Sequence, residues 1–303
     1  MGAGMGTCVA WFSDGRTARG CKEKAVSEKQ YENILVEKGN GITWVRLNRP
    51  EKRNAMSPAL HYDMEDALSR LAADEETKVL VLAGAGDAWC AGQDLRLYFR
   101  GTENDAVERR RSNEASHHWR WEILSAFPKP TIAMVHGYCF GGAFTQLCAV
   151  DFVITAEDAV YGLSEVNWGI IPGGIVSWNL MDMMLPRHAL YYAATGDTFG
   201  GKRAVELGLA NFSVPRESLE DETKKFCEKL MKINPSVLRY TKEAVRCVRD
   251  MSADQARDYL RSKQDSLSRN DAEIRDKVGM KQFLDEKSYR PGLGPYRRGQ
   301  DAP

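Results

Sequence analysis

The chain has 303 residues, of which 43% are hydrophobic and 28% are charged, as is usual for a soluble globular protein. Lys plus Arg and Asp plus Glu each total 42, so the formal net charge is zero. This balance argues against nucleic-acid binding driven by overall basicity and against a polybasic membrane anchor, and no apolar run reaches the length of a membrane span. Seven cysteines without a C-x-x-C pair, together with the lack of a secretory signal, predict reduced thiols and a cytoplasmic location.

The N-terminal half of the sequence alternates predicted strands and helices. Residues 1–30 are rich in Gly, Lys and Arg, which predicts a disordered leader rather than a signal peptide. Residues 41–50 alternate in polarity like a strand, and residues 57–74 have the period of a helix with Ser57 as N-cap and Pro58 at its first position. Apolar runs rich in β-branched residues predict strands buried on both faces at 78–86, 130–137 and 151–158.

The C-terminal third reads differently. After about residue 185 the sequence predicts helices and no further strands, and it ends in a tail rich in Pro and Gly. Alternation of strands and helices is typical of an α/β fold. We therefore expect a leader at 1–30, an α/β core at 31–195, and a helical region with an irregular tail at 196–303.

Two of the predicted buried strands end in small residues just before a helix, in the turns Ala91-Gly92-Gln93 and Gly141-Gly142-Ala143. Backbone N–H groups at such a position have no partner within the helix. Two turns side by side would direct two N–H donors at one oxygen, as in an oxyanion hole. The alternative is that the glycines only allow a helix and a strand to pack closely, and the residues alone leave both readings open. The spacing fits neither a G-x-G-x-x-G motif nor a P-loop.

Several long segments, matched in order, resemble the crotonase (enoyl-CoA hydratase/isomerase) superfamily. They are "LNRPEKRNAMS", "AGAGDAWCAGQDL", "KPTIAMVHGYCFGGAF" and "YGLSEVNWGIIPG". The segments "DLRLYFR", "YYAATGDTFGG" and "GMKQFLDEKSYRPGL" further resemble the hydroxycinnamoyl-CoA, or feruloyl-CoA, hydratase-lyases. The resemblance runs from about residue 31 to residue 296. It implies a crotonase-type ββα spiral core with a helical C-terminal trimerisation region, assembled as a homotrimer or hexamer.

The resemblance also implies a reaction. Such enzymes hydrate feruloyl-CoA or p-coumaroyl-CoA and cleave the β-hydroxy thioester to an aromatic aldehyde and acetyl-CoA. It assigns acid/base chemistry to Glu165 and oxyanion binding to the N–H groups of Gln93 and Gly142. Thr145 stands where hydratases with two glutamates carry the second one. Coenzyme A enters with the substrate, so no cofactor and no metal are expected.

By pattern alone, Glu165 could equally cap a helix or pair with an arginine. Its apolar neighbours in the sequence, Leu163, Val166, Trp168 and Ile170, favour burial of the carboxyl group, which would raise its pKa. The remaining site residues rest on the resemblance. For the aromatic ring and the site lining they are Tyr98, Tyr259, Thr145, Ser164 and Trp168, and for coenzyme A they are Lys52, Ala91, Gly92, Asp94 and Leu95.

Some features depart from the expected pattern or point elsewhere. Gln93 occupies a position where hydratase-lyases usually carry Met, so its side chain could alter ring selection. His117 and His118 lack a third metal ligand at useful spacing, and Cys90, Cys139 and Cys148 are expected to be inert core thiols.

Two alternatives to a hydratase-lyase remain open. One is another crotonase with a single glutamate, acting as a hydratase, isomerase or acyl-CoA hydrolase. The other is a non-catalytic relative that binds acyl-CoA or RNA.

Overall fold

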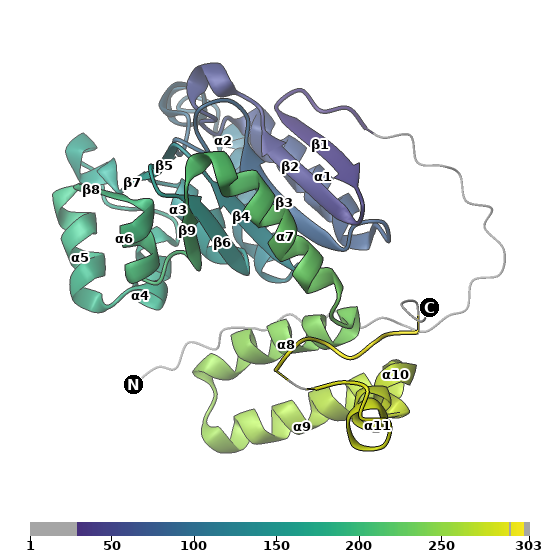
Figure 1. The fold of residues 1–303 in the computed structure, drawn as a ribbon. Helices are drawn as coiled ribbons and strands as arrows, with labels where there is room; N and C mark the ends of the chain where they lie inside the picture. Colours follow the sequence, from purple (N-terminus) through teal and green to yellow (C-terminus); the bar gives the residue numbers. More distant parts are fainter. Residues whose placement is uncertain (1–28, 291, 300–303) are drawn as a thin grey trace.

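The computed structural model describes residues 29–290 and 292–299, so almost all of the expected leader lies outside the described residues (Figure 1). Within them, six strands form one sheet in the order β1-β2-β3-β4-β6-β9. β1 pairs with β2 antiparallel, and every later pair in this sheet is parallel. The strands are β1 (Ile34–Gly39), β2 (Ile42–Leu47), β3 (Val79–Gly84), β4 (Thr131–Val135), β6 (Phe152–Ala156) and β9 (Phe212–Val214).

A second sheet in the described residues has three short strands, β5 (Tyr138–Phe140), β7 (Val160–Gly162) and β8 (Thr198–Gly200). β5 follows β4 and β7 follows β6, and these two short strands pair in parallel. The segment after β3 joins the small sheet through an isolated β-bridge, a backbone pairing of Cys90 with Cys139. The chain thus steps from the large sheet to the small one at each turn and then enters a helix, which is the ββα spiral that we expected.

The strands predicted at 41–50, 78–86, 130–137 and 151–158 are confirmed as β2, β3, β4 and β6. All residues of β3 and β4 are buried, as their continuous apolar sequence predicts. The expectation that strands stop after about residue 185 is wrong, because β8 and β9 lie beyond it. Each has only three residues, too few to show a periodic pattern.

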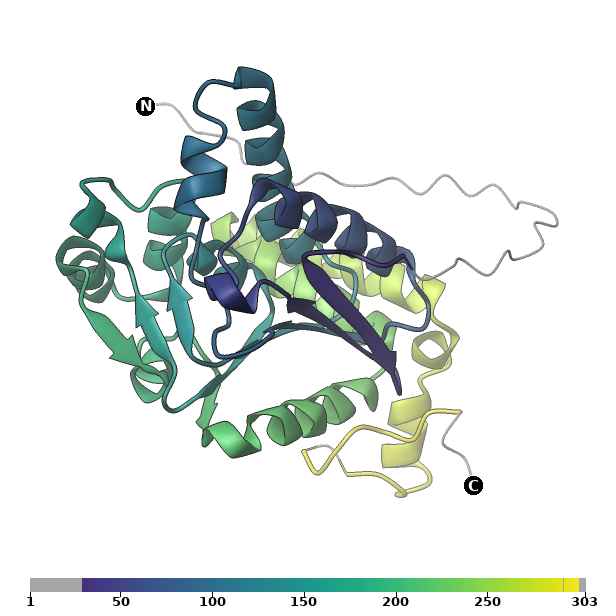
Figure 2. The ribbon, with the colours of Figure 1, turned by 90° about the horizontal axis from the view of Figure 1, so that it is seen from above.

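Two helices cover the large sheet, with α7 across one face and α1 on the other (Figures 1 and 2). The Ser57 hydroxyl accepts a hydrogen bond from Leu60 N–H at 3.3 Å and Pro58 opens α1, which confirms the predicted start of that helix. The helices are α1 (Pro58–Ala73), α2 (Ala106–His117), α3 (Ala143–Ala149), α4 (Val176–Met183), α5 (Pro186–Thr195), α6 (Gly201–Glu206), α7 (Leu219–Met231), α8 (Pro235–Cys247), α9 (Ala253–Asn270), α10 (Ala272–Arg275) and α11 (Val278–Leu284).

Short helices of other types complete the described chain. Two are π-helices, η2 (Leu95–Arg100) and η3 (His118–Ile123). The others are 3-10 helices, η1 (Pro50–Lys52), η4 (Ser164–Trp168), η5 (Arg216–Ser218) and η6 (Val248–Asp250). No helix in the part of the chain that is described is long and apolar enough to cross a membrane.

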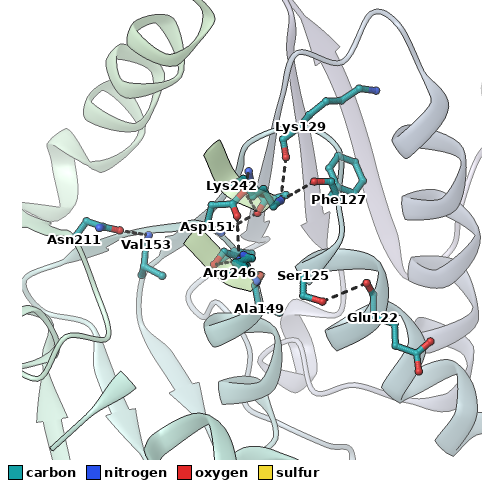
Figure 3. Close-up of polar contacts among 12 residues, drawn as sticks. Glu122, Ser125, Phe127, Lys129, Ala149, Asp151, Val153, Asn211, Lys242 and Arg246 are labelled. Carbon is teal, nitrogen blue, oxygen red and sulfur yellow. Dashed lines mark hydrogen bonds and ion pairs between the residues drawn. The ribbon is translucent and has the colours of Figure 1, made fainter. Parts of the chain in front are cut away.

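The C-terminal helices α8 and α9 lie below the large sheet in Figure 1, and a half-buried ionic cluster joins α8 to the core (Figure 3). Lys242 Nζ lies 2.8 Å from Asp151 Oδ2, and an Arg246 guanidinium nitrogen lies 3.0 Å from Asp151 Oδ1. The same Arg246 nitrogen donates to the carbonyl groups of Ala149 and Val150, where α3 ends. Because cations favour the C-terminal end of a helix, this cluster holds α8 against α3.

Candidate active site

The two glycine turns predicted from the sequence lie against each other. Gly92 and Gly141 both have left-handed backbone angles, with φ of +93° and +53°. A Cβ atom on Gly92 would lie only 2.7 Å from Phe140 O and 3.5 Å from Gly142 N. Only glycine combines this backbone angle with so close an approach, so these glycines let the two turns lie against each other.

Two backbone N–H groups in these turns are without acceptors. Met56 hydrogen-bonds to both neighbours of Gln93, accepting from Asp94 N–H at 2.9 Å and donating to Gly92 O at 2.8 Å. That arrangement leaves the Gln93 N–H unused. In the described part of the chain no hydrogen bond is formed by the N–H of Gln93 or of Gly142, and a Cβ on Gly142 would lie 3.8 Å from Gln93 N. Two neighbouring unpaired donors can receive one negatively charged oxygen.

The Glu165 carboxyl group lies beside the second turn. Glu165 belongs to η4, which follows β7, and a Cβ on Gly141 would lie 3.1 Å from Glu165 Oε1. The other oxygen, Oε2, is buried and has no hydrogen-bond partner among the described residues. Burial raises the pKa of the Glu165 carboxyl group, as the sequence led us to expect. An unpaired carboxyl group with a raised pKa is suited to act as a general acid and base near neutral pH.

The apolar neighbours expected to bury this group do so only in part: Leu163 is fully buried and Val166 is half-buried. Trp168 is 65% exposed and Ile170 is 48% exposed, so these two side chains do not enclose the carboxyl group. η4 ends at Gly169 in a left-handed conformation with φ of +74°. The carboxyl group is instead covered from the side of the Gly141 turn. Ser164 is half-buried next to it.

Thr145 lies in the first turn of α3 with its side chain 2% exposed, and its N–H donates to Gly142 O at 3.2 Å. A hydroxyl group therefore occupies the helix turn behind the unpaired N–H of Gly142. Because a hydroxyl does not ionise near neutral pH, Thr145 cannot supply a second carboxylate at this turn.

The Gln93 side chain belongs to a buried hydrogen-bond chain that the sequence did not reveal. Trp119 Nε1 donates to His61 Nδ1 at 2.9 Å, so the ring proton of neutral His61 is on Nε2, which lies 2.9 Å from Gln93 Oε1. The Gln93 amide nitrogen donates to Ser116 Oγ at 3.1 Å. Reversing the amide would bring its oxygen near Ser116 and Arg120. His61 would then face two donors, and a neutral imidazole cannot accept from both. The Gln93 amide nitrogen therefore faces Ser116 and its oxygen faces His61.

Tyr98 lies next to this chain of hydrogen bonds, on η2. Its ring is 5.2 Å from the His61 ring in an edge-on arrangement, and its hydroxyl donates to Asn113 Oδ1 at 2.6 Å. Tyr259 lies elsewhere, on α9, with Lys263 Nζ 5.2 Å from the centre of its ring. α9 lies beyond α8 and apart from β5 and β7 (Figure 1). A single chain therefore brings Tyr98, but not Tyr259, to the region of the glycine turns.

The residues assigned to coenzyme A follow the first glycine turn and the nearby η1. Lys52 is exposed at the end of η1, Leu95 is 45% exposed, and Ala91 is half-buried. The Asp94 carboxylate accepts from the N–H groups of Arg96 and Leu97 at the start of η2 and pairs with Arg49 at 2.9 Å. Its side chain thus stabilises the turn, and its backbone N–H and C=O are bonded to Met56 O and Tyr98 N–H.

The expected inert thiols are confirmed as buried, free cysteines. Cys90, Cys139 and Cys148 are all buried, and burial raises the pKa of the Cys90 and Cys148 thiols to about 12. A thiol of that pKa is almost fully protonated near neutral pH and is a poor nucleophile. In the described residues no group of three or more His, Cys, Asp or Glu side chains is placed to hold a metal ion.

Comparison with known proteins gives consistent matches. The model of the family described as enoyl-CoA hydratase/isomerase matches residues 37–290. A hydroxycinnamoyl-CoA hydratase-lyase of Pseudomonas fluorescens is 47% identical over 273 residues, covering 89% of this chain and 99% of that protein. An enoyl-CoA hydratase from Bacillus anthracis is similar in structure, with a TM-score of 0.75, 27% identity, and coverage of 88% of this chain and 100% of that one. An enoyl-CoA hydratase from Polaromonas sp. JS666 has the same TM-score of 0.75 and 27% identity, covering 88% and 99%.

Proposed function

Because the chain belongs to the enoyl-CoA hydratase/isomerase family, we propose that it is a hydratase-lyase acting on 4-hydroxycinnamoyl-CoA thioesters such as feruloyl-CoA and p-coumaroyl-CoA. The products are an aromatic aldehyde, vanillin or 4-hydroxybenzaldehyde, and acetyl-CoA. The 47% identity to a hydroxycinnamoyl-CoA hydratase-lyase supports this substrate class. The observation that carries the chemistry is the Glu165 carboxyl group, whose Oε2 has no hydrogen-bond partner among the described residues, beside two N–H donors that form no hydrogen bond there.

In the first half of the reaction, the thioester oxygen accepts hydrogen bonds from the N–H groups of Gln93 and Gly142. Glu165 removes a proton from water as the water oxygen bonds to Cβ, and the electron pair of the double bond moves toward the thioester oxygen. The resulting enolate then takes that proton from Glu165 at Cα, which leaves Glu165 ionised for the second half. The two donors stabilise the oxygen most when it carries negative charge, so they act on the transition state rather than on the bound substrate.

In the second half, Glu165 takes the proton of the β-hydroxyl group. The Cα–Cβ bond breaks, its electron pair passes to the thioester as an enolate, and the former β-carbon leaves as the aldehyde. Glu165 returns this proton to the enolate at Cα, which gives acetyl-CoA and leaves Glu165 ionised as at the start. Negative charge reaches the same oxygen in both halves, so one pair of N–H donors serves both. The steps need no metal ion and no cofactor other than the coenzyme A that the substrate carries.

Ring recognition belongs to Tyr98 and Tyr259 in this proposal, with Ser164 and Trp168 lining the site beside Glu165. Since α9, which carries Tyr259, lies apart from β5 and β7 of its own chain, a neighbouring copy would have to supply this residue. The backbone of residues 91–95 and the exposed Lys52 would contact coenzyme A.

We propose a homotrimer or a hexamer acting in the cytoplasm. Exposed apolar side chains between η4 and α5 support an interface between copies; they are Trp168, Ile171, Trp178, Met181, Leu185 and Leu190. Each of them is at least 48% exposed in a single chain. A cluster of this kind marks a surface that another protein covers.

Incubation of the purified protein with feruloyl-CoA tests the proposal. We expect vanillin and acetyl-CoA in equal amounts, and we expect Glu165→Gln to reduce the rate about 100-fold or more while the protein stays folded. Glu217→Gln, which changes an exposed glutamate of η5, is the matched control and should keep full activity.

Release of free CoA without aldehyde would identify a hydrolase, and accumulation of the β-hydroxy thioester would identify a simple hydratase. Salt-sensitive RNA binding without turnover would identify the non-catalytic alternative.

A further inference from the structure

Arg120 is a buried arginine without an acidic partner. It lies on η3 and is 8% exposed. Among the described residues no carboxylate forms an ion pair with it, whereas Arg49 and Arg246 each pair with an aspartate. Removing a charge from water without pairing it is costly. A fold that keeps such a charge uses the residue for more than packing, or compensates it with a ligand.

The guanidinium group touches the second glycine turn. One of its terminal nitrogens, Nη1, donates to Gly142 O at 2.9 Å, and its Nε donates to Ser116 O at 2.9 Å. A Cβ on Gly142 would lie 3.4 Å from Nη1 and 3.2 Å from Gln93 Cγ. The cation therefore lies within a few ångströms of the residues that carry both unpaired N–H donors.

Ser116, which lies one helical turn before Arg120, also contacts the first glycine turn. Ser116 accepts from Arg120 through its carbonyl group and from the Gln93 amide through its hydroxyl group. Arg120 and Ser116 thus connect the two donor residues, Gln93 and Gly142, although these come from separate strand ends. A fixed distance between two donors is what an oxyanion site requires, because neither donor then has to move as charge develops.

The positive charge of Arg120, like its position, favours a negatively charged oxygen in the site. The Gly142 carbonyl oxygen is negatively polarised and close to the site, so by itself it disfavours a second negative oxygen nearby. Donation from Arg120 offsets that dipole, and the full positive charge attracts an enolate more than a neutral thioester. Such attraction is stronger in a buried site than in water.

We propose that Arg120 is a positioning residue of the thioester-oxygen site, which fixes the Gly142 turn against Gln93 and favours the enolate form of the bound thioester. This rests on the proposed function. The interaction grows as charge develops, so its loss lowers kcat more than it raises KM. Arg120 does not itself touch the substrate.

Kinetics of Arg120→Gln and Arg120→Lys on feruloyl-CoA test this proposal, with Arg246→Gln as the matched control. Arg246 donates to carbonyl groups at the opposite end of α3 (Figure 3). We expect Arg120→Gln to lower kcat about 10- to 100-fold with KM changed less than about threefold. Arg120→Lys keeps the charge but cannot donate along the same two directions, so we expect it to lower kcat about 3- to 10-fold. Arg246→Gln should lower the thermal stability and keep kcat within about threefold.

The absorbance of bound feruloyl-CoA provides a second measurement, which does not change merely because the protein is less stable. Its phenol and thioester carbonyl form one conjugated system, so polarisation of the carbonyl shifts the absorbance to longer wavelength. In a Glu165→Gln background, in which turnover is slowed about 100-fold or more, we expect a shift that shrinks when Arg120→Gln is added and persists when Arg246→Gln is added.

Wild-type kcat in a folded Arg120→Gln variant, or an unchanged absorbance shift, would overturn the role of Arg120. Should Arg120→Gln not fold, Arg120→Lys decides, and full retention of kcat and of the shift in that variant overturns it. A wild-type protein that makes no aldehyde from feruloyl-CoA would instead contradict the proposed function.

Discussion

At the scale of single residues, the proposed site depends on the Glu165 carboxyl group, which forms no ion pair among the described residues. Charged side chains elsewhere in the described chain are commonly paired, as Asp94 is with Arg49 and Asp151 is with Lys242. Glu165 instead has one buried oxygen without a hydrogen-bond partner. Desolvation then acts without an opposing ion pair, which raises the pKa of Glu165 and gives the group its acid/base character.

The pH dependence of the reaction follows from that shift. Glu165 has to be ionised to accept a proton from water, so kcat/KM with feruloyl-CoA should fall as the pH drops through its pKa. Because burial raises this pKa above the ordinary value of 4.5, the midpoint of the acidic limb should lie above pH 4.5. Initial rates at low substrate concentration across the pH range, with the fold monitored by circular dichroism, measure it. A midpoint at or below the ordinary value would contradict the assignment of the base.

Sequence reasoning found some of these residues because they lie in contiguous segments. Glu165 and both glycine turns stand in motifs that resemble a known family, and the order of strand, turn and helix gives the turns a physical meaning. His61, Ser116 and Arg120 have no such local pattern. His61 meets Gln93 across 32 positions and Trp119 across 58 positions, so only the folded chain shows that they support the donors.

At the scale of elements, a neutral histidine joins α1 to η3. His61 accepts from Trp119 and donates to Gln93, and it is fully buried. Burial, and to a smaller extent the nearby positive charge of Arg120, lowers the pKa of His61 to about 3. Protonation would add a charge beside Arg120 and would also remove the acceptor that Trp119 uses.

Acid should therefore destabilise the protein through His61. The unfolded chain binds this proton near pH 6.5, whereas the folded chain binds it only near pH 3. The free energy of unfolding thus falls as the pH drops through this window, by up to about 5 kcal/mol from this group. His61→Gln, which keeps a donor for Gln93 without titrating, should flatten the curve. Urea unfolding of both proteins between pH 7 and pH 4 measures the difference, and parallel curves would refute the role of His61.

The glycine turn before α3 permits a separate test of geometry. Gly141 and Gly174 both have left-handed backbone angles, with φ of +53° and +62°. A Cβ at Gly141 would lie 3.1 Å from Glu165 Oε1, while one at Gly174 would meet nothing within 4 Å. Alanine at either position should therefore cost about 1 kcal/mol of stability. Only Gly141→Ala displaces the carboxyl group, and we expect it alone to lower kcat, by about tenfold or more.

Thermal unfolding and feruloyl-CoA kinetics of the two alanine variants check this comparison. The two proteins should unfold at similar temperatures and differ in kcat. Equal kcat values would mean that Glu165 does not need its place beside the Gly141 turn.

At the scale of the whole molecule, the sequence was informative where elements are long and buried. β3 and β4 carry continuous apolar runs, and α1 carries both a cap and a clear period, so their positions follow from local chemistry. β8 and β9 have three residues each and become strands only by pairing with β7 and β6. The placement of α8 depends on Asp151, Lys242 and Arg246, which meet only after the chain has folded.

The proposed site is incomplete in a single chain, because Tyr259 would come from a neighbouring copy. Leu190 on α5 is 69% exposed and lies in the apolar segment between η4 and α5, whereas Val107 on α2 is 79% exposed and outside it. Leu190→Asp should therefore break the proposed oligomer, because it would place an unpaired charge in an apolar interface. Val107→Asp adds the same charge to an exposed surface and should leave the assembly unchanged. Sedimentation velocity distinguishes one copy from three or six.

Loss of assembly should also remove activity. If a neighbouring copy supplies Tyr259, a monomeric Leu190→Asp variant keeps Glu165 and the two N–H donors but lacks half of the phenol contact. We expect its kcat/KM for feruloyl-CoA to fall about tenfold or more. Tyr259→Phe should lower kcat/KM in the wild-type background and have little further effect in the monomer, because the two changes remove the same contact. A fully active monomer, or equal effects of Tyr259→Phe in both backgrounds, would show that the ring is held within one chain.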